Sequence, residues 1–372
     1  MDVGIIQETF DVVISSAGYR HLASRAPATI QAGRAQFLTA QEAAAAATAK
    51  RPVQVFAQQA EGALTATAQT GMIDLDASPG ADGDTPATTT NLLARYLVIR
   101  EGEEFEFSAH ATSVLFYVIR GSGRSFQESE VIEWNAGDVF VFPGGESILN
   151  EAPHSDAVLF VITDEPFVSM TGCRVPPREE ARCKSTHFTT KAIQARLEDM
   201  VEQSDRKPAA CEEKARHVVT EESDDAVQGE NSAQRSEAAE AGPAAVSADE
   251  PALQQAPEAA DILTFVSAQF EGIGSVAPTI SAAIEMLAAG AQTQPRCHDA
   301  ETIFLPLRGE AACFMVGSER VDCRRNTAIL MPAGTGYARH NGGEGRSFSF
   351  VIHDRGPRPV RTRQSDPDGR AD

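Results

Sequence analysis

The residues of this 372-residue chain best suited to chemistry are a few polar side chains in its C-terminal third. His298 and His340 carry imidazoles and Glu301 a carboxylate, and such groups hold iron and other divalent metals. Two neighbours offer different chemistry. Arg296, if it faces inward, is a fixed cation suited to a carboxylate, and Tyr337 is a weak metal ligand or a phenol donor. A metal site and an anion pocket are therefore competing interpretations of one stretch.

This stretch has a counterpart about 190 residues earlier in the chain. In each copy a histidine, His110 or His298, stands eleven positions before a glycine. PGG at 143–145 matches PAG at 332–334, and each copy closes with an apolar run that ends in aspartate. Agreement at several spacings favours a tandem duplication of one β-unit.

Apolar alternation with a period of two begins at Asn91, and turn residues interrupt it regularly until about Val168. Short strands with closely spaced turns are typical of an all-β sandwich or barrel. Three other segments have distinct patterns. The alanine-rich 36–50 and the amphipathic 191–201 predict helices, while TISAAIEMLAAG at 279–290 predicts either a helix or a pair of strands.

Between the two copies the composition changes sharply. Residues 200–261 contain 15 acidic and 5 basic residues, no aromatic residue and no isoleucine. Such a segment buries too little surface to offset its ordering entropy, so we expect disorder, either as a partner-binding tether or as a solvated insertion. The predicted organisation is a mixed leader at 1–90, a first barrel at 91–175, a connecting strand and helix at 176–199, the acidic linker at 200–261, a second barrel at 262–355 and a polar tail at 356–372.

Charge and segment content exclude several functions. The formal net charge of −21 leaves no basic stripe for nucleic acid, and it disfavours binding to anionic membranes. No run of apolar residues is long enough for a membrane span, and the N-terminus lacks the basic start of a signal peptide. The six cysteines form no CxxC pair, which disfavours a zinc site or a disulfide framework. We therefore expect a cytoplasmic protein.

The two copies resemble the two consensus boxes of the cupin superfamily, whose members are small double-sheet jelly rolls. The corresponding ranges are 108–121 and 296–309 for the first box, and 137–145 and 326–341 for the second. Both copies lack the usual glutamate of the first box and have Val114 and Thr302 there. In this respect the chain is similar to two-barrel cupins (bicupins) of the gentisate and 1-hydroxy-2-naphthoate dioxygenase type. The resemblance implies two tandem cupin barrels with short helices, and a protein that self-associates as a homo-oligomer.

In those dioxygenases three histidines of one barrel hold Fe(II), which accepts an aromatic diol and O2. An HxH pair supplies two of the ligands, because alternate residues of a strand point into the barrel. In the first barrel Ser108 and Ile148 stand at two of the three ligand positions, which leaves His110 as a vestigial interior histidine and the barrel as scaffold. In the second barrel Arg296 and Tyr337 stand at the corresponding positions.

A metal in the second barrel would need His298, His340 and Glu301 as substitute ligands. Strand alternation turns His340 away from the side that Tyr337 faces, unless a bulge re-aims it. Without a metal, the resemblance places Arg296, Tyr337 and the motif residue Asn341 around a bound ligand.

Two functions therefore stay open. The first is a bicupin with degenerate metal sites and no cofactor, acting as an assembly module or binding a small organic ligand, anionic or aromatic. The second is a ring-cleaving dioxygenase that uses Fe(II) or another divalent metal in the second barrel and acts on a gentisate-like diol.

Overall fold

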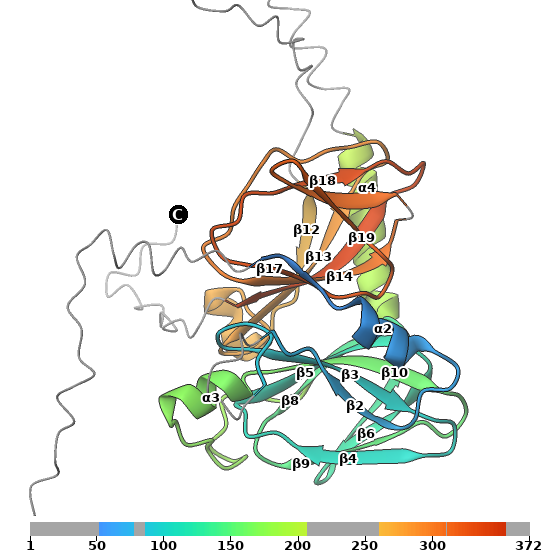
Figure 1. Cartoon of the computed structure of the whole chain (residues 1–372). Coiled ribbons are helices and arrows are strands. Elements are labelled where there is room, and N and C mark those ends of the chain that lie inside the picture. The colour runs from blue at the N-terminus through green and yellow to red at the C-terminus, as the bar shows by residue number, and fades with distance from the viewer. Residues whose placement is uncertain (1–51, 78–85, 207–259, 310, 355–372) are drawn as a thin grey trace, which may run out of the picture. The chain divides into compact units, whose positions relative to one another are not determined.

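The computed structural model describes residues 52–77, 86–206, 260–309 and 311–354. The predicted helix at 36–50, nearly all of the acidic linker and the tail at 356–372 lie outside these ranges. Within them the chain is mainly β, and antiparallel sheets build two successive barrels (Figure 1). The predicted fold class is therefore confirmed. Among the described helices, none is both long and apolar enough to cross a membrane.

The first barrel combines a six-stranded sheet, ordered β11-β8-β5-β10-β3-β2, with a four-stranded sheet, ordered β4-β9-β6-β7. The strands are β2 (Gly71–Asp74), β3 (Leu93–Ile99), β4 (Glu104–Ser108), β5 (Ser113–Arg120), β6 (Ser122–Gln127), β7 (Glu130–Asn135), β8 (Val139–Pro143), β9 (Ser147–Glu151), β10 (Ala157–Thr163) and β11 (Thr186–Phe188). Helix α3 (Glu165–Thr171) follows β10, and α4 (Thr190–Arg206) follows β11. The predicted helix at 191–201 is thus confirmed, and it continues beyond both ends of that range.

The second barrel combines a six-stranded sheet, ordered β1-β17-β14-β19-β13-β12, with a three-stranded sheet, ordered β16-β15-β18. The strands are β1 (Gln54–Val55), β12 (Asp261–Thr264), β13 (Ile280–Leu287), β14 (Thr302–Arg308), β15 (Ala312–Val316), β16 (Glu319–Asp322), β17 (Ile329–Met331), β18 (Ala338–Asn341) and β19 (Ser347–Asp354). Helix α2 (Ala57–Leu64) and a 3-10 helix, η2 (Ala268–Ile273), complete the described elements. The ambiguous segment at 279–290 is a strand, β13.

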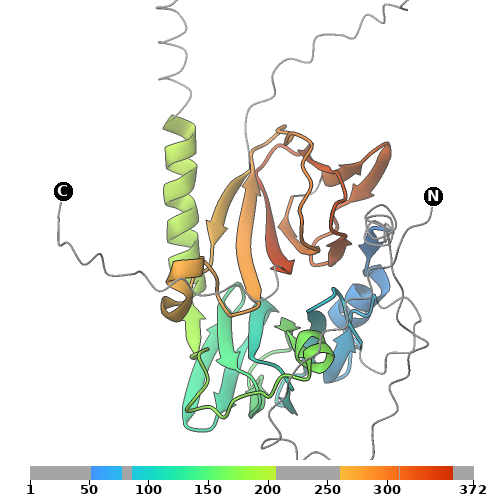
Figure 2. The same ribbon diagram turned by 90° about the vertical axis from the view of Figure 1, so that its left-hand side faces the viewer.

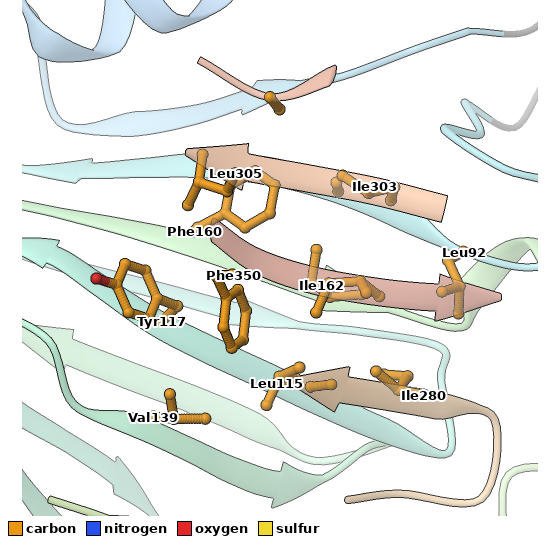
Figure 3. Packing of buried hydrophobic residues seen from close by; sticks show 14 of the residues in the cluster. Leu92, Leu115, Tyr117, Val139, Phe160, Ile162, Ile280, Ile303, Leu305 and Phe350 are labelled. Carbon is orange, nitrogen blue, oxygen red and sulfur yellow. The ribbon is translucent and has the colours of Figure 1, made fainter. Parts of the chain in front are cut away.

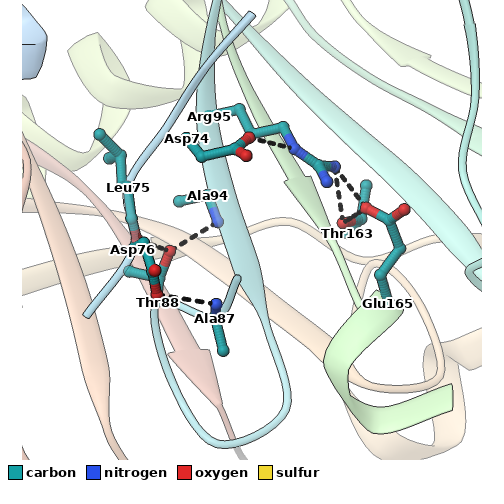
Figure 4. A network of polar contacts seen from close by, with 9 residues as sticks. All are labelled: Asp74, Leu75, Asp76, Ala87, Thr88, Ala94, Arg95, Thr163 and Glu165. Atoms are coloured by element: carbon teal, nitrogen blue, oxygen red, sulfur yellow. Dashed lines mark hydrogen bonds and ion pairs between the residues drawn. The ribbon is translucent and has the colours of Figure 1, made fainter. Parts of the chain in front are cut away.

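The described part of the leader belongs to the barrels. β1 pairs with β17 of the second barrel, whereas β2 pairs with β3 of the first. Side chains reinforce this attachment: Arg95 on β3 donates to Asp74 on β2 at 2.7 Å, and it also contacts Glu165 at the start of α3 (Figure 4). The hydroxyl of Thr88 joins Leu75 to Ala94 in the same network.

The largest apolar cluster lies between the two barrels. It contains side chains from both six-stranded sheets, and Figure 3 shows Tyr117 and Phe160 of the first barrel close to Leu305 and Phe350 of the second. The ring centroids of Tyr117 and Phe350 are 4.9 Å apart and the rings are stacked. The outer face of each large sheet is therefore covered by the other barrel.

Strand β10 shows why these strands lack apolar-polar alternation. Phe160 and Ile162 belong to the cluster between the barrels, while Leu159 and Val161 belong to the core inside the first barrel. Successive side chains of a strand point to opposite faces, so a strand buried on both faces is a continuous apolar run. The seven residues of β10 are all buried.

Polar contacts at the ends of the two last strands follow the duplication. Asp164 directly follows β10 and accepts a hydrogen bond from Thr279 of the second barrel at 2.7 Å. Asp354 ends β19 and accepts hydrogen bonds from Thr89 Oγ1 at 2.6 Å and Asn91 N at 2.9 Å. The last aspartate of each copy therefore binds the other barrel. Asp164 contacts the segment just before β13, and Asp354 contacts the segment just before β3.

Gly144, in the corner after β8, has no space for a side chain. A Cβ at this position would lie 1.9 Å from the carbonyl oxygen of Ala111, so the backbone would have to move. We expect Gly144→Ala to lower the free energy of unfolding by about 1–3 kcal/mol, measured by urea denaturation. Gly336→Ala is the matched control, because nothing lies within 4 Å of a Cβ there. Equal stability of the two variants would contradict the prediction.

Candidate functional site in the second barrel

Alternate strand positions bring a group of polar side chains into the second barrel. Tyr337 and Arg339 lie two residues apart and are each 1% exposed. Glu285 on β13 and Ser349 on β19 are equally buried. Arg296 is held beside Tyr337 by two backbone hydrogen bonds, at 2.8 and 2.9 Å. The inward orientation of Arg296, left open by the sequence, is the one observed.

Glu285 lies between two arginines. Nη2 of Arg296 donates to both carboxylate oxygens, at 2.9 and 2.8 Å. Nη1 of Arg339 donates to Oε2 at 2.7 Å, and its Nη2 donates to Ser349 Oγ at 2.9 Å. Two guanidinium groups thus face one carboxylate, so this ion cluster has an excess of one positive charge.

The ionisation of the site follows from burial and charge. Burial raises the pKa of the Glu285 carboxyl, but Arg339 and Arg296 outweigh burial and hold that pKa below its ordinary value. Burial raises the pKa of Tyr337 to about 12, although the charge of Arg296 opposes the rise. At neutral pH Glu285 is therefore ionised, and the Tyr337 phenol keeps its proton and is available as a donor.

Two donor atoms of the site are incompletely bonded. Tyr337 Oη and Arg296 Nε are buried, and neither makes a well-formed hydrogen bond to a described residue, although the two side chains interact with each other. The guanidinium carbon of Arg296 lies 5.5 Å from the centroid of the Tyr337 ring. Because both atoms carry protons, the complementary group is a hydrogen-bond acceptor, and the surplus positive charge favours an anionic one.

His298 lies next to this cluster. Its ring centroid is 5.7 Å from that of Tyr337 and 5.1 Å from that of His353, which the sequence reasoning did not select. His353 in turn has Nδ1 3.2 Å from Thr302 Oγ1. The predicted residues Arg296, His298 and Tyr337 therefore lie together in space.

The other predicted ligands lie elsewhere. The Glu301 carboxylate accepts hydrogen bonds from Thr90 N at 2.6 Å and Thr90 Oγ1 at 2.7 Å, so it joins the leader to the second barrel. His340 lies on β18, where its neighbour Arg339 is buried inside the barrel. Side-chain alternation therefore turns His340 to the outer side, where it pairs with Cys313 on β15. Asn341 is buried, and its amide is bonded to backbone groups, with Nδ2 donating to Ala288 O at 2.8 Å.

The donor set does not fit the three-histidine iron centre that the fold family implies. Across the described ranges, no three His, Cys, Asp or Glu side chains are grouped closely enough to hold a metal ion. The ion cluster in this interior contains Arg296 and Arg339, whose charges repel a cation, and its carboxylate, Glu285, is already bonded to both. We therefore derive no reaction step through a metal.

The first barrel has buried polar side chains of a different kind: Ser125 and Asn150 are uncharged and hydrogen-bond to each other at 2.7 Å. His110 is exposed rather than interior, because Phe107 and Ala109 take the inward positions and His110 follows β4 in a bend. Ile148 is fully buried in a core that includes the stacked rings of Phe116 and Phe140, with centroids 4.5 Å apart. Aromatic side chains thus fill much of this interior, and the role of the barrel as scaffold stays a prediction.

Sequence reasoning missed Glu285 and Arg339, the most buried members of the ion cluster. A signal for each was present. Glu285 is a single charge inside the apolar run ISAAIEML, and Arg339 stands two positions after Tyr337, on the same strand face. A charged residue in a buried strand requires a partner, so the two could have been paired.

Comparison with known proteins gives the class of fold. No protein-family model matches the chain. A 5-aminosalicylate 1,2-dioxygenase from a Comamonas species is 33% identical over 85 residues, which is 23% of this chain and 23% of that enzyme. A salicylate 1,2-dioxygenase from Pseudaminobacter salicylatoxidans superposes with a TM-score of 0.55 at 14% identity, over 82% of this chain and 83% of that one. A structure of the same enzyme with gentisate gives a TM-score of 0.55 over 82% of this chain.

The protein thus has the bicupin fold, with two cupin barrels packed through their large sheets. Within that class it is similar in structure to a salicylate 1,2-dioxygenase and, over 85 residues, in sequence to a 5-aminosalicylate 1,2-dioxygenase. The likeness in structure, at 14% identity, describes the fold, and the sequence match spans about a quarter of the curated enzyme.

Proposed function

We propose that this chain is a non-catalytic bicupin that binds a small organic carboxylate inside its second barrel. The observation that supports the proposal most is the ion cluster of Arg296, Glu285 and Arg339, which has one positive charge in excess. A carboxylate beside Arg296 that accepts from the Tyr337 phenol would balance this charge and give that buried hydroxyl an acceptor. The bound gentisate of the salicylate 1,2-dioxygenase structure makes an aromatic carboxylate the first ligand to test.

Replacement of Arg296 tests the proposal. We expect salicylate or gentisate to bind the full chain in calorimetry, and salicylamide, which has the same ring without the charge, to bind much more weakly. Arg296→Met should weaken salicylate binding by about 10-fold or more, because it removes a charge-assisted hydrogen bond. Arg124→Met is the matched control, since Arg124 is an exposed arginine of the first barrel that pairs with Glu151.

The alternative function, a dioxygenase, is tested by different measurements on the same protein. Its support is the similarity to 5-aminosalicylate and salicylate dioxygenases. Near-stoichiometric iron after reconstitution with Fe(II), together with O2 uptake on gentisate that His298→Ala abolishes, would replace our proposal with this alternative. Failure of all aromatic carboxylates to bind would contradict the proposal as well. Self-association, which the resemblance implies, is part of the proposal and is measured by sedimentation.

A further inference from the structure

Two adjoining hollows lie at the edge of the second barrel, and the smaller one is also lined by the first barrel and α4. The smaller has a volume of about 230 Å³ and an apolar lining that includes Tyr117, Ile193, Leu197 and Phe348. These residues come from β5, α4 and β19, and α4 runs beside β12 in Figures 1 and 2. The larger hollow has a volume of about 880 Å³. Leu307 and Arg308 line both, so the two hollows adjoin each other.

The larger hollow is strongly basic, although the chain has a net charge of −21. Its lining includes four arginines and one carboxylate: Arg308, Arg320, Arg324, Arg325 and Asp322. The carboxylate pairs with Arg320 at 2.8 Å. No described carboxylate lies within ion-pair distance of the other three arginines. Among the described residues that line this hollow, arginines therefore outnumber carboxylates by four to one, which favours a bound anion.

The loop that carries Arg325 is held in place by the first barrel. Tyr96 Oη donates to the carbonyl oxygen of Asn326 at 2.7 Å and accepts from Ala328 N at 3.1 Å. Arg325 also lies near the apolar hollow: burial raises the pKa of Tyr117 to about 12, and the charge of Arg325 opposes that rise. A guanidinium on an anchored loop is positioned before any ligand arrives, which lowers the entropic cost of binding.

The duplication supplies an internal comparison for Arg308. Each barrel has a bulge at the end of its central strand, one residue before the matching arginine, Arg120 or Arg308. In the first barrel Arg120 donates to the carbonyl oxygen of Leu64 at the end of α2. Arg308 is exposed at the rim of both hollows. The two copies thus differ at this position. The end of α2 contacts Arg120 in the first barrel, whereas Arg308 of the second barrel is exposed to solvent.

We propose that this junction is a second ligand site, for an amphiphilic anion. The apolar part of the ligand, an aromatic ring or short acyl chain, lies in the small hollow against Leu197 and Phe348. Its carboxylate or phosphate group lies against Arg308 and Arg325. The junction site is separate from the Arg296 cluster and does not depend on the function proposed for it.

The test uses the full chain and 1-naphthyl phosphate, titrated by calorimetry at low salt. We expect saturable binding, with 1-naphthol and inorganic phosphate each binding about tenfold or more weakly, because each lacks one half of the contacts. The double variant Arg308→Gln/Arg325→Gln should weaken binding of the ester by about tenfold or more. Arg174→Gln/Arg182→Gln, which removes two exposed arginines elsewhere in the first barrel's connection, should leave it within about twofold. Melting temperatures verify that both variants are folded.

Each outcome decides the proposal. Absence of saturable binding at millimolar ester, an equal loss in both double variants, or inorganic phosphate that binds as tightly as the ester would overturn it. The affinities of 1-naphthoate and 1-naphthyl phosphate are then compared. The tighter of the two indicates whether the natural ligand carries a carboxylate or a phosphate group. If naphthoate binds at the Arg296 cluster inside the second barrel rather than at the junction, its affinity is unchanged in Arg308→Gln/Arg325→Gln.

Discussion

Replacing Glu285 by glutamine is expected to lower the free energy of unfolding by about 3–5 kcal/mol, because it leaves the buried Arg339 and the partly buried Arg296 without a counter-charge. Glutamine keeps the shape of the side chain, so packing is preserved and the change is electrostatic. Arg339 is the more affected partner, since its side chain is 2% exposed and that of Arg296 is 24% exposed. Urea denaturation followed by circular dichroism measures the loss.

Two controls separate burial from charge in this experiment. Glu151→Gln breaks the exposed pair with Arg124, whose side chain is 45% exposed, and should cost about 0–1 kcal/mol. The triple variant Glu285→Leu/Arg296→Met/Arg339→Met removes the whole ion cluster and should recover most of the lost stability, since apolar replacements of buried ion clusters are often neutral. If Glu285→Gln costs no more than Glu151→Gln, the ion cluster is not buried as described.

The stability lost in Glu285→Gln is also expected to depend on pH. The arginines hold the pKa of Glu285 below its ordinary value. A carboxyl with a lowered folded pKa stabilises the protein above the unfolded pKa, about 4.3, and this contribution is lost as pH falls through the folded pKa. The stability difference between the native chain and Glu285→Gln should therefore be full near neutral pH and shrink below about pH 4.

The fold was predictable because it depends on local signals that the duplication repeats. Turn residues and short apolar strands gave two barrels, and the amphipathic spacing of Ile193 and Leu197 gave α4. Strand β13 was ambiguous because both of its faces are covered, by the barrel interior and by the other barrel, which removes the period of two. The pairing of β1 with β17 was not predictable, because a two-residue strand has almost no pattern.

The candidate site was predictable only where strand alternation applied. It turned His340 to the side opposite Tyr337, as observed, but it left the orientation of Arg296 open. Strand alternation placed His110 inside the first barrel, which is wrong. The residue that points inward there is Ala109, one position earlier than the alignment of the two copies implies. The Thr90 contact of Glu301 could not be foreseen, since it joins residues 211 positions apart. Contacts across a duplicated interface depend on tertiary packing, which the spacing of motifs does not encode.

Phe350→Ala is expected to destabilise both barrels together, by about 3–5 kcal/mol. Phe350 is fully buried in the cluster between the barrels, where it stacks on Tyr117 of the first barrel and contacts Phe265 edge-on at 5.8 Å. The cavity left by the ring opens between the two large sheets, so neither barrel can close it alone. Because each sheet covers the other, loss of this contact weakens the fold of both.

The chain provides its own reporter for this coupling. Its single tryptophan, Trp134, is buried in the first barrel, whereas Phe350 lies on β19 of the second. If the cluster joins the barrels into one cooperative unit, Phe350→Ala shifts the urea midpoint of Trp134 fluorescence as far as that of circular dichroism. Met170→Ala, at a position 64% exposed, should shift neither. A Trp134 transition that stays in place while circular dichroism shifts would mean that the barrels unfold independently, and that the apolar cluster between them adds little to the stability of the first.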